Sequence, residues 1–207
     1  MRDYSPRRSI GRLPRNVVLV VTEGRTEEIY FRGLKRRACD VEIRTPSSSP
    51  TDALNLVKLS VRHIKGDDVV PENGDLVICA FDVEGNAQAN LDQAVRMAEE
   101  HGIMLAISNP CFELWTLFHF RGVDHRLSCR EAQAILSEHI PGYRKGDDHR
   151  IILTPRRTKA STRAMNLQER FGAPTPRRLL ECNPCTNMNL VIDAIEGLMA
   201  RNARFSL

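Results

Sequence analysis

The sequence predicts an α/β fold: a parallel sheet of about four strands flanked by helices, followed by a helical C-terminal portion. Short apolar runs recur over the first 120 residues, and segments of helical periodicity separate them. The rest of the chain has helical patterns almost throughout. Strands that alternate with helices are typical of βαβ units, whose strands run parallel.

The strands are expected at residues 17–21, 41–45, 75–81 and 103–107. A helix is expected after the first strand, capped by Thr26, with Glu27 and Glu28 in its first turn, where carboxylates suit the helix dipole. Two further helices are expected around the third strand, because apolar residues recur there at helical spacing (Leu54, Val57, Val61 and Ile64; Leu91, Ala94, Val95 and Ala98).

Helices are expected to dominate from residue 109 onward. Asn109 and Pro110 are expected to open a helix, as its cap and first residue. Ser128 and Glu131 have the spacing of a capping box. A basic helix is expected near 157–171, and a closing helix has its apolar face at Met188, Val191, Ile195 and Leu198. The polar loop 141–154 is expected to be mobile.

At 207 residues, the chain has room for one sizeable core. We expect a basic, flexible arm over 1–15 and a single domain over 16–207. The apolar runs are too short to cross a bilayer, and no secretory signal is evident. Six dispersed cysteines fit a reduced, cytoplasmic setting. Cys182 and Cys185 have no second pair at zinc spacing, so we expect neither metal nor disulfide chemistry there.

Basic residues are concentrated in two segments, although the net charge is only +4. Residues 1–16 carry five arginines against Asp3, and residues 156–178 carry seven basic residues against Glu169. Such clusters are expected for a nucleic-acid partner, although a solvated surface is the alternative. Arg156, Arg157 and Lys159 are the candidates for contact with its phosphates.

Carboxylates follow the first and third strands directly. Glu23 lies in a tight turn before a helix, where it could act as a general acid or base beside a phosphate; the alternative is a solvated loop residue. Arg25, in the same turn, is a candidate for substrate contact. Asp82 and Glu84 alternate on extended chain, so both could face one Mg²⁺ or Mn²⁺ ion, although such pairs also cap helices.

Glu113 lies one turn into the helix expected after the fourth strand, on or near the same crevice, which makes it a further candidate metal ligand. His119 follows six residues later and is not on the same helix face, so we expect a buried, hydrogen-bonded histidine. The chain has no phosphate loop of the Gly-x-x-x-x-Gly-Lys type, and it should not hydrolyse ATP itself.

Several motifs together resemble the RloB-like family. They are Val-Val-Thr-Glu-Gly-x-Thr-Glu near the N-terminus, Phe-Asp-x-Glu in the middle, and Ser-Asn-Pro-Cys-Phe-Glu-Leu-Trp followed by His-Phe. Tyr143-Arg144-Lys145 and Asn183-Pro184-Cys185-Thr186 continue the match. The resemblance spans nearly the whole chain from residue 16 onward.

The resemblance implies a compact Toprim-like fold, as in nucleases and topoisomerases. It implies Glu23 as the general acid or base and Asp82 with Glu84 as magnesium ligands, although the family pattern has aspartate at the second position. Substrate contacts by Asn109 and Lys145 are implied in the same way. So are an ABC-type ATPase partner and a role in antiviral defence.

These observations lead to the hypothesis of a Mg²⁺-dependent nuclease that acts on DNA or on RNA such as tRNA. One alternative is a non-catalytic Toprim-like subunit that binds nucleic acid or the ATPase. A third possibility is a metal-dependent phosphatase or nucleotidyl hydrolase, which would use the same acids on small phosphoesters.

Overall fold

The computed structural model describes residues 16–35, 41–46, 52–66 and 69–204. The arm expected over residues 1–15 lies outside these ranges. Within them, no helix combines the length and apolar character needed to span a membrane.

A five-stranded sheet in the order β2-β1-β3-β4-β5 forms the centre of the fold. The first four strands are parallel: β1 (Asn16–Thr22), β2 (Val41–Arg44), β3 (Leu76–Asp82) and β4 (Met104–Asn109). The short β5 (Cys185–Thr186) pairs antiparallel with β4. The α/β prediction is therefore confirmed, together with its four parallel strands, and the fifth strand is an addition.

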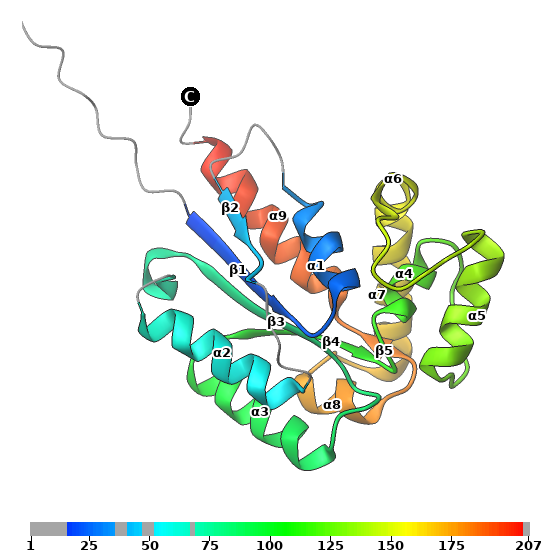
Figure 1. Ribbon diagram of the computed structural model, residues 1–207, viewed down its shortest axis with the longest axis horizontal. Coiled ribbons are helices and arrows are strands. Elements are labelled where there is room, and N and C mark those ends of the chain that lie inside the picture. Colours follow the sequence, from blue (N-terminus) through cyan, green and yellow to red (C-terminus); the bar gives the residue numbers. More distant parts are fainter. Residues whose placement is uncertain (1–15, 36–40, 47–51, 67–68, 205–207) are drawn as a thin grey trace, which may run out of the picture.

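Helices cover both faces of the sheet (Figure 1). One face packs against α2 (Ala53–Lys65), α3 (Gln88–Glu100) and α8 (Pro176–Glu181). The other packs against α1 (Arg25–Arg32) and α9 (Met188–Arg204). On that second side, beyond β4 and β5, lie α4 (Glu113–Phe118), α5 (Cys129–His139), α6 (Arg150–Leu153) and α7 (Arg157–Phe171). Two 3-10 turns, Pro71–Asn73 and Thr154–Arg156, complete the connections.

Two hydrophobic cores result, one on each face of the sheet. In β1, Val18 and Val20 face the core of α1 and α9, whereas Val17, Leu19 and Val21 face that of α2 and α3. Successive side chains of a strand point to opposite faces, so a central parallel strand must be apolar at every position. This requirement explains why the strands appear in the sequence as unbroken apolar runs.

Several helices begin or end where the sequence predicts. The basic helix expected at 157–171 is α7, and Ser128 and Glu131 form the predicted capping box at the start of α5. Two starts differ from the prediction. Gly24 is the N-cap of α1, with Thr26 inside the helix, and α4 begins at Glu113 because Asn109 still belongs to β4.

The loop expected to be mobile is attached to the rest of the fold. It contains α6, and the backbone N–H of Gly146 donates to Thr26 Oγ1 of α1 at 2.9 Å. This contact holds the middle of the loop over the N-terminus of α1.

The expectation for the C-terminal cysteines was wrong, because Cys182 and Cys185 form a disulfide. The bond closes the turn between α8 and β5. The Cα atoms of the two cysteines are 5.5 Å apart. The other cysteines within the described residues, Cys79, Cys111 and Cys129, are free thiols.

Candidate metal centre

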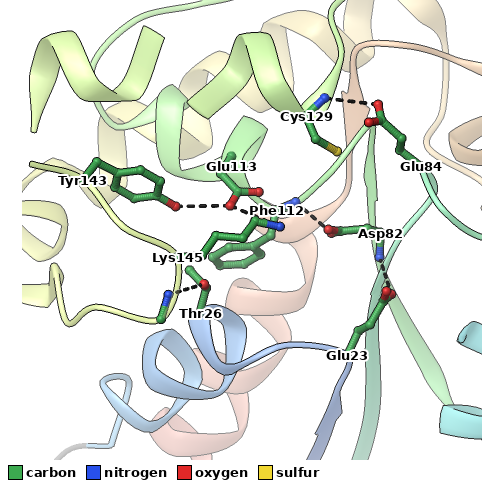
Figure 2. A network of polar contacts seen from close by, with 10 residues as sticks. Glu23, Thr26, Asp82, Glu84, Phe112, Glu113, Cys129, Tyr143 and Lys145 are labelled. Carbon is green, nitrogen blue, oxygen red and sulfur yellow. Dashed lines mark hydrogen bonds and ion pairs between the residues drawn. The ribbon is translucent and has the colours of Figure 1, made fainter. Parts of the chain in front are cut away.

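The carboxyl ends of β1, β3 and β4 meet at one edge of the sheet. The parallel register pairs Thr22 with Ala80 and Asp82 with Ser108, so the residues that follow these strands lie next to one another. Ligands bind at this edge in open parallel sheets. Figure 2 shows acidic side chains converging there from β1, β3 and the start of α4.

Asp82 is the last residue of β3, and only 8% of it is exposed. Its Oδ1 accepts a 2.8 Å hydrogen bond from the backbone N–H of Phe112, just before α4. Burial, followed by repulsion from Glu27 and Glu113, raises the pKa of Asp82 well above its usual range. The aspartate is therefore held in place by a hydrogen bond, but the positive charge near it does not balance the burial and the neighbouring carboxylates.

Glu113, the first residue of α4, is fully buried. Its Oε1 accepts a hydrogen bond from the Tyr143 hydroxyl at 3.3 Å and lies 3.4 Å from Lys145 Nζ (Figure 2). Its Oε2 is buried without a hydrogen-bond partner among the described residues. Since burying a polar atom without a partner costs free energy, this oxygen points to a missing ligand.

Ligand atoms from Asp82, Cys111 and Glu113 lie within 4.8 Å of one another, so one ion could contact all three side chains. A hydrogen bond with Cys129, then burial, raises the pKa of the Cys111 thiol far above its usual range. Carboxylate oxygens suit hard cations such as Mg²⁺ or Mn²⁺, so Asp82 and Glu113 are the donors that such an ion would prefer in this group.

Glu23 joins the group through the end of β3. Its Oε2 accepts hydrogen bonds from the Asp82 N–H at 3.3 Å and from the Asn86 side-chain amide at 3.4 Å. Partial burial raises the pKa of Glu23, although these two hydrogen bonds oppose the rise. The structure thus brings together Glu23, Asp82 and Glu113, three of the acids singled out in the sequence.

Asn86 was missed in the sequence, yet it orders this edge. Its side-chain amide also donates to the Asp82 carbonyl at 2.8 Å, while its oxygen accepts from the Ala53 N–H at the start of α2. An asparagine just after Gly85 in a turn was the available signal, because asparagine side chains commonly bond to the backbone of turns.

Glu27 lies in the first turn of α1, as the sequence predicts, and it also belongs to the acidic group. It is 5% exposed, and its carboxylate folds back toward Gly24. A Cβ at position 24 would lie 2.7 Å from Glu27 Oε2, so the glycine leaves room for this acid. Burial raises the pKa of Glu27 to about 7, and repulsion from Glu113 adds to the effect.

Lys145 supplies positive charge to the acidic group from the loop between α5 and α6. About half of its side chain is exposed. Partial burial lowers the pKa of Lys145, but attraction to Glu113 and Asp82 outweighs this effect and raises it overall. Burial and the nearby Glu113 also raise the pKa of Tyr143, which therefore donates its proton to that carboxylate.

Glu84, expected beside Asp82, lies apart from this group. Its carboxylate accepts a 3.1 Å hydrogen bond from the backbone N–H of Cys129 at the start of α5 (Figure 2). The extended chain ends at Asp82, and the following turn contains Gly85 with φ +94°. Alternation along a strand therefore does not apply to these two carboxylates.

The expected substrate-binding residues divide into two groups. Near the acids are Lys145 and Arg25, whose exposed side chain runs beside Gly146. Asn109 is buried, and its amide donates to the carbonyls of Leu179 and Leu180, so that it holds α8 against β4.

The three basic candidates around α7 have different surroundings. Arg156 donates to the Ile152 carbonyl and lies over the ring of Phe120. Arg157 forms a 2.8 Å ion pair with Glu196 of α9. Lys159 is exposed to solvent.

His119 is buried, as expected, and lies among aromatic rings. Its Nδ1 is 3.0 Å from the Trp115 carbonyl, and burial lowers its pKa to about 4. His119 is therefore a buried, hydrogen-bonded histidine, as the sequence predicts.

The family model of RloB-like proteins matches residues 18–195, a range that includes the acidic group at the carboxyl edge of the sheet. No curated protein matches the chain.

Proposed function

This chain belongs to the RloB-like protein family, and we propose that it hydrolyses phosphodiester bonds in nucleic acid with the help of Mg²⁺ or Mn²⁺. The observation that carries the proposal is the pairing of Asp82 with Glu113 at the carboxyl edge of the sheet. Both are buried, their ligand atoms are within 4.8 Å, and one oxygen of Glu113 has no partner in the described part of the chain.

The charge balance of the group supports a bound cation. Four carboxylates, from Glu23, Glu27, Asp82 and Glu113, face the positive charge of Lys145. Two carboxylates sharing a buried site cannot both ionise easily unless a cation compensates them. A divalent ion would lower the pKa values of these acids and allow the group to carry its full negative charge near neutral pH.

Asp82 and Glu113 would hold the ion, each already oriented by another group: the Phe112 N–H for the aspartate, and Tyr143 with Lys145 for the glutamate. When bound, the ion would stabilise the negative charge that develops on the phosphoryl oxygens.

Glu23 would act as the general acid or base. Its pKa is raised toward neutral pH, and its hydrogen bond to the Asp82 N–H places it within the acidic group. Lys145 lies in the loop between α5 and α6, and Arg25 of α1 lies beside Gly146 of the same loop. Both would attract the phosphate oxygens. Both cations complement a substrate that is negatively charged on either side of the reacting bond.

The ABC-type ATPase partner and the defence role remain proposals that rest on the sequence resemblance. A non-catalytic binding subunit is the rival function. The position of Glu84 favours it to some extent, because this carboxylate is used to cap α5 and lies away from Asp82. Metal binding without cleavage would be its signature.

The test is a cleavage assay with labelled single- and double-stranded DNA, mixed RNA and tRNA, in Mg²⁺, Mn²⁺ or chelator. Asp82→Asn and Glu23→Gln should each reduce cleavage by at least about a hundredfold, since general acid–base catalysis alone contributes about 10²–10⁴. Glu99→Gln, on the exposed face of α3, is the matched control and should cleave normally.

Metal binding is measured separately from cleavage. Mg²⁺ at 100 times its dissociation constant should add about 2.7 kcal/mol to the free energy of unfolding, and Asp82→Asn should remove this gain. Cleavage that persists in chelator, or in both active-site variants, would contradict the proposal. A metal-linked gain in stability without cleavage of any substrate would favour the binding subunit.

A further inference from the structure

A groove lined by arginines lies at the far end of α4 from Glu113. It has a volume of about 420 Å³ and is formed by the loop 121–124 and one face of α7. Arg121 comes from the loop, Arg163 and Arg170 come from α7, and Asn166 lies between the latter two along the helix. Arg163 and Arg170 belong to the basic segment 156–178 that the sequence predicts to contact nucleic acid, whereas Arg121 and Asn166 are not singled out in the sequence.

Each arginine of the groove is held by an uncharged contact. Arg163 donates to the carbonyl of Phe118, at the last residue of α4, and is partly buried. Arg121 donates to the Gly122 carbonyl at 3.4 Å, and the Arg170 guanidinium lies 5.5 Å from the centre of the Phe171 ring. These contacts orient the guanidinium groups without placing a carboxylate against them.

Four other arginines of the described chain are paired with acids. Arg32 binds Glu28, Arg44 binds Glu42, Arg150 binds Asp148 and Arg157 binds Glu196. In contrast, no ion pair with a carboxylate forms at Arg121, Arg163 or Arg170 within residues 69–204. Asp124 also lines the groove, but its carboxylate is 3.4 Å from His125 Nδ1.

The three guanidinium charges around the groove repel one another, and an anion bound between them would relieve this repulsion. Guanidinium groups bind phosphate oxygens in a planar, bidentate geometry, and arginine is favoured over lysine for this reason. Asn166 adds an amide donor to the same wall. We infer that this groove binds a phosphodiester of the nucleic-acid substrate, at a site separate from the acidic group. The inference rests on the proposed function for the identity of its ligand.

The position of the groove suits a strand that also reaches the acids. Helix α4 starts at Glu113 and ends at Phe118, which contacts Arg163. Its six residues correspond to a length of about 9 Å at 1.5 Å per residue. The groove would therefore hold the backbone a short distance from the reacting phosphate. Arg157, which is paired with Glu196, would contribute less.

The test measures binding in chelator, so that its result does not depend on cleavage. The anisotropy of fluorescent single-stranded DNA, single-stranded RNA and tRNA is followed at several salt concentrations for the full chain. Arg163→Gln and Arg170→Gln should each weaken binding about three- to tenfold and lower the slope of log K against log salt by about 0.7–0.9, the value for one lost phosphate contact.

Arg96→Gln is the matched control, because Arg96 is exposed on α3, which covers the opposite face of the sheet. It should leave affinity and slope unchanged. Thermal melting of all variants verifies that they remain folded. Groove variants that behave like Arg96→Gln, or a wild-type chain that binds none of the nucleic acids, would overturn the inference.

Two comparisons separate this inference from its alternatives. A poly-glutamate of equal charge should compete poorly; competition equal to that of the nucleic acid would indicate an acidic protein partner and overturn the phosphodiester assignment. If the groove variants lose binding as expected while the wild-type chain cleaves nothing, the result supports phosphodiester binding in the groove and contradicts the proposed hydrolysis.

Discussion

Replacing Glu27 by glutamine should stabilise the protein at alkaline pH. In the folded chain, burial and the neighbouring Glu113 raise the pKa of Glu27 from 4.5 to about 7. A carboxyl group with a higher pKa in the folded state binds protons preferentially there, so the free energy of unfolding falls as the pH rises from about 4.5 to about 7. Each pKa unit is worth about 1.4 kcal/mol, which gives a loss of about 3 kcal/mol.

Glu27→Gln removes this loss, because an amide does not ionise. At about pH 4.5, where Glu27 is largely protonated in the folded protein, the variant and the wild type should be nearly equal in stability. At about pH 8 the variant should be more stable by about 3 kcal/mol. Part of this gain comes through Asp82, whose pKa is raised in part by Glu27.

Urea unfolding in chelator, followed by circular dichroism across this pH range, measures the difference. Glu28→Gln is the control: Glu28 is next in sequence but forms a 2.8 Å ion pair with Arg32 on the surface of α1. Adding Mg²⁺ at about pH 8 should stabilise the wild type. Parallel pH profiles for the wild type and Glu27→Gln would refute the argument that Glu27 is held, uncompensated, in the acidic group.

Four further predictions concern other parts of the structure. Lys145→Met should tighten Mg²⁺ binding about tenfold by calorimetry, because two charges 3.4 Å apart in a water-like medium interact by about 1.2 kcal/mol; unchanged affinity would show that Lys145 does not compete with the ion. Glu113→Gln should abolish the increase in melting temperature caused by Mg²⁺, and an increase equal to that of the wild type would place the ion elsewhere. Reducing the Cys182–Cys185 disulfide should lower the free energy of unfolding by about 2 kcal/mol in urea titrations, as expected for so short a loop, and no change would argue against the bond. Ser128→Ala should cost about 1 kcal/mol in the same titrations through loss of the capping box, and a neutral result would mean that α5 does not depend on its cap.

Much of the fold could be predicted because its main strands are buried on both faces. Burial on both faces requires unbroken apolar runs, and these are visible in the sequence at β1, β3 and β4. The two-residue β5 could not be found in this way, because its pairing with Ser108 and Asn109 depends on residues more than 70 positions away.

The candidate site was only partly predictable, because its acids come from separate segments. Glu23 and Asp82 were found since each follows a recognisable strand. The membership of Glu27 in the acidic group could not be predicted, because a glutamate in the first turn of a helix is stabilised by the dipole even when it is fully solvated. Glu84 was misplaced because local spacing does not show that the chain turns immediately after Asp82.

The closeness of Gly24 to Glu27 has an evolutionary consequence. A methyl group at position 24 would force the Glu27 carboxylate to move, since the two atoms would be only 2.7 Å apart. Once residue 27 had become small, the same methyl group would meet no such obstacle. The two positions are therefore expected to change in a fixed order: a smaller residue at position 27 must come first, because alanine at 24 would displace the Glu27 carboxylate from the acidic group.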